Sequence, residues 1–325
     1  MQYDGHDESL RSVKPIGGYF ELELPHGKLP YPNAVPVNFG RGGLALIVHA
    51  RNYRRIWIPD YICPVVPRYL ERIGVEYSRY EINLNLEPTI IPRLERDEAF
   101  LYVNYFGVKD AYCRTLEQTQ KNLILDLTQA FYYEPTVADG FNSARKFFGV
   151  PDGAFVFGSG LSNKDLPQAI SHDQFAPLLR RADGDLAGGY SAFHSLDDAR
   201  ENLDAARMAS LTRLLISAVN LGSARIRRLA NFAKLATTLG STNELKFEQD
   251  TMGPLVYPYL VQDGERLKKQ LIGKKIFCPT YWPKIQSMGA AAGRLVNDLV
   301  CIPCDQRYDC TDMEFILDMV RGCST

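Results

Sequence analysis

The chain has 325 residues, of which 46% are hydrophobic and 23% charged, and its formal net charge is −1. This length and composition are typical of a globular protein with room for one large domain and a smaller one. A net charge near zero lacks the basic excess that nucleic acids and anionic membranes select, so the expected partners are small molecules or another protein chain.

The first ten residues, Met1 to Leu10, carry three acidic side chains and no apolar stretch of the kind a secretory signal needs. No apolar run approaches the length of a membrane span. Seven cysteines without a small-domain framework indicate reduced thiols, so we expect a cytoplasmic protein. Cys301 and Cys304 form a Cys-x-x-Cys pair with Cys310 beyond, but a zinc site needs four ligands and none completes it. The sequence therefore predicts no metal site.

The N-terminal part leads into a glycine-rich helix start. The alternating stretch 17–24 predicts a short strand or an extended arm, and the four prolines within 25–36 predict a loop. Asn-Phe-Gly-Arg-Gly-Gly then opens an apolar helical pattern. Glycines at a helix start let backbone N–H groups approach a phosphate, and an arginine adds a charged contact. Arg41, Gly42 and Gly43 are therefore candidate phosphate-binding residues.

Strands and helices alternate through the next hundred residues. The predicted strands cover 54–59, 75–82, 99–106, 123–127 and 153–157, and the predicted helices cover 65–73 and 111–122. This alternation predicts a mostly parallel sheet with helices on both faces. Ligands of such sheets bind at the carboxyl ends of the strands, where Tyr61, Asn104 and Asp126 fall.

The residues that carry chemistry surround the fourth predicted strand. Its apolar run ends on Asp126, and Gln129 follows three residues later. Ser143 and Lys146 come next, with two phenylalanines and a Pro-Asp-Gly turn beside the lysine. A lysine amine can form a Schiff base with an aldehyde, and a carboxylate can keep a pyridine nitrogen protonated. The pattern predicts a pyridoxal 5'-phosphate (PLP) site with Lys146 and Asp126 as its catalytic residues.

The second half of the chain changes to helices and then to a mixed pattern. Helices are expected over 171–188 (with glycine breaks), from Ser195 as N-cap to about 220, and over 224–239. Strands over 255–261, 275–277 and 299–302 and helices over 264–271 and 313–320 follow, the last opened by the capping box Thr311 to Glu314. We expect a large domain over 1–222 and a small α+β domain over 223–325.

Asp126-Leu-Thr-Gln129, followed by Ser143, Lys146 and Asp152-Gly153, resembles the DegT/DnrJ-type sugar aminotransferases. These are PLP enzymes of the aspartate-aminotransferase fold, with an Asp-x-x-Gln/His element followed by a Ser…Lys element. Ser143 and Lys146 are three residues apart where the family usually has five. The resemblance implies an α/β large domain with a mostly parallel sheet sandwiched by helices, and a homodimer, because sites of this fold lie between subunits. It also implies transfer of an amino group from an amino acid such as glutamate to a keto sugar, most often nucleotide-linked, in amino-sugar or surface-polysaccharide biosynthesis.

The resemblance also assigns roles to residues. Gln129 would tune the phenolic oxygen of PLP. The family stacks an aromatic on the PLP ring where this chain has Cys63, and Tyr61 is two residues earlier, so the stacking residue stays open. The sugar dehydratase branch lacks the lysine, and Lys146 argues against that reaction. A different PLP reaction, or a binding protein without turnover, remains the alternative. The predicted cofactor-binding residues are Arg41, Gly42, Gly43, Tyr61, Asp126, Gln129, Ser143 and Lys146.

Overall fold

The computed structural model describes residues 16–248, 250–283, 285 and 289–323. The stretch Met1 to Leu10, considered above for its acidic side chains, lies outside them. A seven-stranded sheet forms the centre of the molecule, in the strand order β1-β7-β6-β5-β4-β2-β3. Its strands are β1 (Val35–Val37), β2 (Arg55–Pro59), β3 (Glu76–Tyr80), β4 (Glu98–Val103), β5 (Leu123–Leu127), β6 (Asp139–Asn142) and β7 (Ala154–Phe157).

The sheet is mostly parallel, as the alternating pattern predicts. Strands β3, β2, β4, β5 and β6 pair in parallel, and β7 near one edge runs opposite to them, so that it pairs antiparallel with both β6 and the short edge strand β1. Every residue of β4 and β5 is buried, which explains why both strands are almost entirely apolar rather than alternating, with Glu98 and Asp126 as the charged exceptions. Their register places Val103 opposite Asp126, so the two strands end together at one rim of the sheet.

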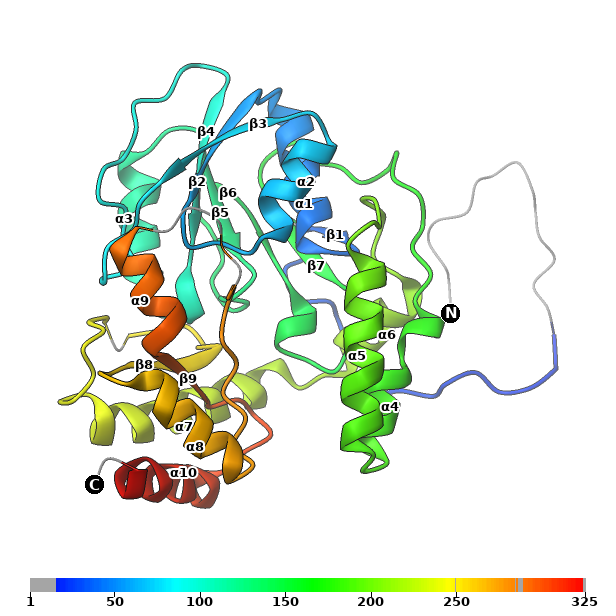
Figure 1. Ribbon diagram of the computed structural model, residues 1–325. Helices are drawn as coiled ribbons and strands as arrows, with labels where there is room; N and C mark the ends of the chain where they lie inside the picture. The colour runs from blue at the N-terminus through cyan, green and yellow to red at the C-terminus, as the bar shows by residue number, and fades with distance from the viewer. Residues whose placement is uncertain (1–15, 249, 284, 286–288, 324–325) are drawn as a thin grey trace.

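Helices cover the sheet on both faces: Figure 1 shows α1 and α2 on one side of it and α3 on the other. The helices of this half are α1 (Gly40–Arg51), α2 (Val65–Arg72), α3 (Asp110–Thr119), α4 (Ala176–Ala182), α5 (Leu186–Arg200) and α6 (Ser210–Ala218), with 3-10 turns η1 (Tyr105–Gly107), η2 (Ala144–Lys146) and η3 (His172–Gln174). None of the described helices is both long enough and apolar enough to cross a bilayer.

The C-terminal part forms a smaller α+β unit, at the lower left of Figure 1. It consists of α7 (Leu221–Leu239), β8 (Val256–Leu260), α8 (Gly264–Gly273), α9 (Ala290–Asp298), β9 (Leu299–Pro303) and α10 (Cys310–Cys323). Strands β8 and β9 form an antiparallel pair, and α10 packs against α7 and α8. The division at 222/223 stays a prediction, although α7 begins beside it.

The predicted helix that starts at Ser195 is wrong. Ser195 lies inside α5, which ends at Arg200, and α6 starts only at Ser210. The segment between them is extended because the backbone of Arg207 pairs with Val37 of β1 and with Gln168. Tertiary pairing with a sheet edge thus overrides the local helical pattern.

Other element boundaries also differ from the sequence expectation. The segment 17–24 forms no strand: it has bends at 17–19 and is largely exposed, so the strand alternative is wrong. Residues 275–277 are not a strand, and the short strands β1 and β6 and helix α9 were not expected. The final helix is opened by Asp309, whose Oδ1 accepts the N–H of Thr311 (2.9 Å) and of Asp312 (3.2 Å), and not by the box at Thr311 and Glu314.

Candidate active site

Hydrogen bonds link Asp126, Thr128 and Lys146 at the carboxyl end of β5. Asp126 Oδ1 accepts the backbone N–H of Thr128 at 2.9 Å, and Lys146 Nζ lies 3.0 Å from Thr128 Oγ1. Lys146 ends the short turn η2, which follows β6, the parallel neighbour of β5. Adjacent strands therefore deliver the acid and the amine to the same rim of the sheet, where ligands of open α/β sheets bind.

Burial shifts the two ionisable groups toward their neutral forms. Asp126 is 4% exposed, and burial raises the pKa of its carboxyl, opposed by the charge of Lys146 and by the hydrogen bonds from Thr128. Burial likewise lowers the pKa of the Lys146 amine, opposed by the charge of Asp126. A lysine with a depressed pKa reacts more readily as a nucleophile, since more of it is unprotonated at neutral pH.

Gln129 offers an unused donor inside the protein. Its Oε1 accepts the backbone N–H of Phe106 at 2.8 Å, while its Nε2 is buried and has no hydrogen-bond partner. A buried unpaired amide costs free energy on the order of 1–3 kcal/mol, so such a group calls for an explanation. A bound ligand with an oxygen acceptor would satisfy it.

The first turn of α1 comes very close to the same place. A Cβ added to Gly40 would lie 2.9 Å from Thr128 Cγ2, so only glycine permits this approach to the residue that contacts Lys146. No side chain caps the helix start, which leaves its N–H groups available to an anion. Gly42 and Gly43 serve packing as well: their added Cβ atoms would meet Asn38 Oδ1 and the side chain of Phe141, each at 2.9 Å.

Arg41 belongs to a group of three arginines beside this helix start. Its guanidinium donates to the backbone carbonyl of Arg200 and lies 4.6 Å from the centre of the Phe39 ring. Arg145 forms an ion pair with Asp197 of α5 at 3.0 Å, and its Nε is buried without a partner. Arg200 is 4% exposed, and burial lowers its pKa to about 10. Among the described residues, Asp197 is the one carboxylate that forms an ion pair with any of these three arginines.

The two candidates for ring stacking differ in their surroundings. Tyr61 is fully buried, stacks on Tyr105 with ring centres 5.7 Å apart, and contacts Trp282 of the C-terminal unit at 4.7 Å. Cys63 is partly buried; burial raises the pKa of its thiol, and the neighbouring charge of Lys146 opposes that rise. Cys63 thus lies within electrostatic reach of Lys146, whereas Tyr61 forms part of an aromatic wall.

The remaining predicted residues and several unpredicted ones have defined places. Ser143 is buried at the start of η2. Asn104 is bound within the start of α3: its Nδ2 donates to Asp110 Oδ1 at 2.6 Å, and its Oδ1 accepts the N–H of Lys109 at 3.1 Å. Sequence reasoning missed Thr128, although it lies inside the Asp-x-x-Gln element, and also Asn142, whose buried Nδ2 has no partner. It also missed Asp197, whose helix carries no local signal.

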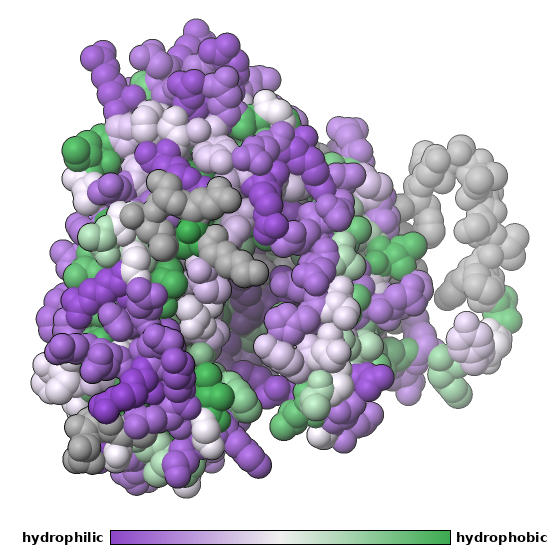
Figure 2. Space-filling view, in the orientation of Figure 1, coloured by the Kyte–Doolittle hydropathy of each residue, from purple (hydrophilic) through white to green (hydrophobic). Residues whose placement is uncertain are grey.

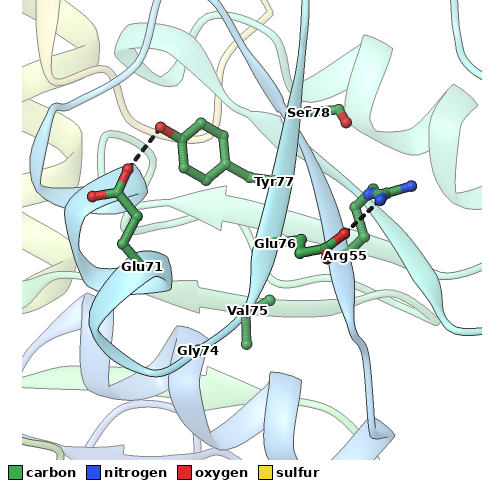
Figure 3. Close-up of a pocket in the computed structure, with 7 residues that line it drawn as sticks. All are labelled: Arg55, Glu71, Gly74, Val75, Glu76, Tyr77 and Ser78. Carbon is green, nitrogen blue, oxygen red and sulfur yellow. Dashed lines mark hydrogen bonds and ion pairs between the residues drawn. The ribbon is translucent and has the colours of Figure 1, made fainter.

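Figure 2 shows a hollow between the C-terminal unit and the side of the molecule formed by α4 and α5. A separate shallow cavity of about 450 Å³ lies beside β3 and the end of α2 (Figure 3). Glu76 pairs with Arg55 there, and Tyr77 donates to Glu71 at 2.9 Å, so its polar groups already satisfy one another. This cavity is at the amino end of the parallel strands, the end opposite to Lys146, and is not the ligand site that the sheet predicts.

Among the residues that the structure describes, no three metal-binding side chains come together. Cys301 and Cys304 are buried at β9, and Cys310 is exposed at the start of α10. Burial raises the pKa of the Cys304 thiol to about 12, which disfavours the thiolate that a metal would need.

Comparison with solved structures identifies the fold. An aminotransferase of the DegT DnrJ EryC1 StrS group from Brucella abortus superposes with a TM-score of 0.59 at 13% identity, over 89% of this chain and 85% of that one. The chain has the DegT-type aminotransferase fold. A Streptococcus pneumoniae protein in its PLP form gives a TM-score of 0.61 at 11% identity (90% and 87% covered). DesI, solved with its TDP-sugar product, gives 0.58 at 17% identity (90% and 80% covered). The sequence itself matches no family model and no curated protein.

The residues at the rim fit the cofactor of this aminotransferase fold. PLP presents an aldehyde, a pyridine nitrogen, a phenolic oxygen and a phosphate. Lys146, Asp126, the unpartnered Gln129 Nε2 and the uncapped start of α1 are the matching amine, carboxylate, donor and anion site. These assignments stay predictions, since identities of 11–17% establish the fold alone.

Proposed function

We propose that the protein is a PLP-dependent aminotransferase that moves an amino group from an amino acid, such as glutamate, to a keto sugar. The observation that carries the proposal is the partly buried Lys146 amine, with its depressed pKa, joined through Thr128 to the buried Asp126. The DegT-type fold supports it, as do the PLP and TDP-sugar ligands named for structures of that fold.

Each residue has a defined task in this proposal. PLP bound here would supply the electron sink that stabilises the carbanion at the amino-acid Cα. Lys146 would hold the cofactor and, as a free amine, would move the proton to and from that carbon, a role worth roughly 10²–10⁴ in rate. Asp126 would keep the ring nitrogen protonated, and Gln129 Nε2 would donate to the phenolic oxygen. The first turn of α1 would bind the phosphate.

The wider setting follows the same proposal. A nucleotide-linked sugar is the acceptor class that the TDP-sugar complex of the similar fold suggests. The described cysteines other than Cys323 are free thiols, which suits a reducing cytoplasm. A homodimer remains part of the proposal, because sites of this fold lie between subunits.

The test is a covalent trap at Lys146. The purified chain is mixed with PLP, reduced with borohydride and digested, and mass spectrometry locates the modified lysine. We expect the adduct on Lys146, no adduct there in Lys146→Ala, and wild-type trapping in the control Lys121→Ala, which removes an exposed lysine next to β5. Glutamate added before reduction should bleach the yellow absorbance and prevent trapping.

The outcomes separate the alternatives. Bleaching by glutamate followed by amination of a nucleotide-linked keto sugar supports the proposed reaction. Trapping at Lys146 without bleaching by any amino acid would select a different PLP reaction or a binding role. Trapping at another lysine would refute the assignment of the site.

A further inference from the structure

Arg228 of α7 is among the largest fully buried side chains, at 2% exposure. Its Nη1 donates to the carbonyl oxygens of Pro254 (2.9 Å) and Leu255 (3.3 Å), and its Nη2 donates to that of Phe147 (3.2 Å). No ion pair of Arg228 with a carboxylate is present in the described part of the chain. A buried cation without a directly paired carboxylate is costly, and burial lowers the pKa of Arg228, although the charge of Asp305 opposes that shift. The presence of a buried arginine at this position therefore calls for an explanation other than packing.

The guanidinium and a second donor meet at one carbonyl. Gln306, from the segment after β9, donates its Nε2 to the same Phe147 oxygen at 2.7 Å, while its buried Oε1 has no partner. Arg228 also lies over the Phe147 ring, 4.6 Å from its centre. Gln306 is thus used as a donor only, and both donors bind the backbone carbonyl of the residue that follows Lys146.

The location of this carbonyl matters because η2 is only three residues long. The long lysine stem cannot fix the amine by itself, so the backbone on either side must be held. On the N-terminal side, Ala144 N–H donates to Gly153 O at 2.9 Å. On the C-terminal side, Arg228 and Gln306 hold the Phe147 carbonyl. A displacement of about 1 Å in a reacting group can cost on the order of 10²-fold in rate.

We propose that Arg228 and Gln306 are positioning residues for Lys146. By holding the Phe147 carbonyl, they make the position of the Lys146 amine depend on the position of the C-terminal unit. The inference rests on the proposed function only in taking Lys146 as the lysine that reacts with the cofactor.

The test uses Gln306→Leu, which removes one donor without removing a buried charge, and Arg228→Lys, which keeps the charge but loses the fork that reaches several carbonyls. The first readout is the rate at which PLP is trapped on Lys146, which we expect to fall about 10-fold or more in both variants. The second uses the full chain without PLP: the pH midpoint of acetylation of Lys146 by acetic anhydride, followed by mass spectrometry. The acetylation midpoint should move to higher pH, toward that of an ordinary exposed lysine, because the amine leaves its buried position.

The control is Lys234→Met, which removes an exposed ion pair with Glu314 from the same helix and should change neither readout. An unchanged trapping rate and acetylation midpoint in Gln306→Leu would overturn the proposal, whether or not its melting temperature falls. If wild-type protein traps PLP at another lysine, the proposed function fails, while the acetylation midpoint still decides whether Arg228 and Gln306 position Lys146.

Discussion

At the scale of single residues, the charge of the Lys146 amine depends on its neighbours. After burial, Asp126 and Cys63, the positive charge of Arg145 acts to lower its pKa and the negative charge of Asp197 acts to raise it. These two groups form an ion pair with each other, so their effects on the lysine largely cancel while the pair is intact.

Removing one partner at a time should therefore shift the pKa of Lys146 in opposite directions. Arg145→Gln removes a repelling charge and should raise it, and Asp197→Asn removes an attracting charge and should lower it. The measurement is the pH dependence of PLP trapping at Lys146. A higher amine pKa moves the rise in trapping to higher pH, because the neutral amine is the nucleophile. Arg180→Gln, which breaks an exposed pair with Asp185 on α4 and α5, is the control. Shifts of the same sign in both variants would contradict this electrostatic account.

The sequence identified the residues whose chemical type is distinctive and not those whose role depends on geometry. Asp126 and Lys146 stand out because a charged group is unusual beside an apolar strand or two phenylalanines. Thr128 and Asn142 carry ordinary polar side chains, and only their distances and burial reveal them. In the sequence, Arg228 is one of several basic residues in the predicted helix 224–239, a pattern that favours a solvated helix face, yet it is buried.

At the scale of elements, Glu117 of α3 organises the connection from β5 to β6. Its carboxylate accepts hydrogen bonds from Tyr133 Oη and Thr136 N (both 2.7 Å), Val137 N (2.9 Å) and Ala138 N (3.1 Å). Burial acts to raise its pKa, but these donors outweigh it, and the pKa lies below the ordinary value of 4.5. The folded state therefore favours the ionised form.

Glu117→Gln should lower the free energy of unfolding by about 1–3 kcal/mol at neutral pH, because the donors lose a charged acceptor. A pKa depressed in the folded state gives stability that is present above the unfolded pKa and is lost as pH falls through the folded one. The difference between wild type and variant should therefore shrink below about pH 4. Urea unfolding of the wild type and of Glu117→Gln, at pH 7 and at acidic pH, measures this difference in the free energy of unfolding. Glu265→Gln, which breaks an exposed i,i+4 pair with Lys269, is the control and should leave stability almost unchanged at both pH values. A difference that does not vary with pH would refute the linkage.

The elements that follow from sequence pattern are those with strong local signals. Strand β5 has the predicted bounds because its run of apolar residues is buried on both faces. Strand β6 is Asp-Gly-Phe-Asn, which has no strand pattern, and it forms because its backbone completes the ladder beside β5. The break between α5 and α6 likewise depends on pairing with β1, far away in sequence.

At the scale of the whole molecule, the C-terminal unit meets the large sheet at an aromatic contact. Trp282 lies 4.7 Å from the ring of Tyr61 and 6.2 Å from that of Tyr105. Nearby, Asp60 Oδ2 accepts the N–H of Gly289 at 3.0 Å. These contacts join the two parts beside the candidate site.

Trp282→Ala should uncouple the unfolding of the two parts. Each aromatic pair contributes about 0.5–1.5 kcal/mol beyond the burial of apolar area. Loss of the pairs with Tyr61 and Tyr105 weakens the contact between the two parts, while the hydrophobic core of each part stays intact. We expect calorimetry to show two thermal transitions in the variant where the wild type shows one. Phe277→Ala removes a residue that is 66% exposed in the same connecting segment and should leave a single transition. A single transition at the wild-type temperature in Trp282→Ala would refute this role.

The positions of the two donors to Phe147 have a consequence for the order of folding. Asp126, Thr128 and Lys146 are close in sequence and can come together as soon as β5 and β6 pair. Arg228 and Gln306 are 81 and 159 residues from Phe147 along the chain. Contacts of such separation cost more loop-closure entropy and form late, and residues later in the chain also leave the ribosome later. In a nascent chain, Asp126 and Lys146 would thus come together before Arg228 and Gln306 fix the backbone beside the lysine. Reactivity of Lys146 toward an aldehyde would therefore develop only with the last stage of folding.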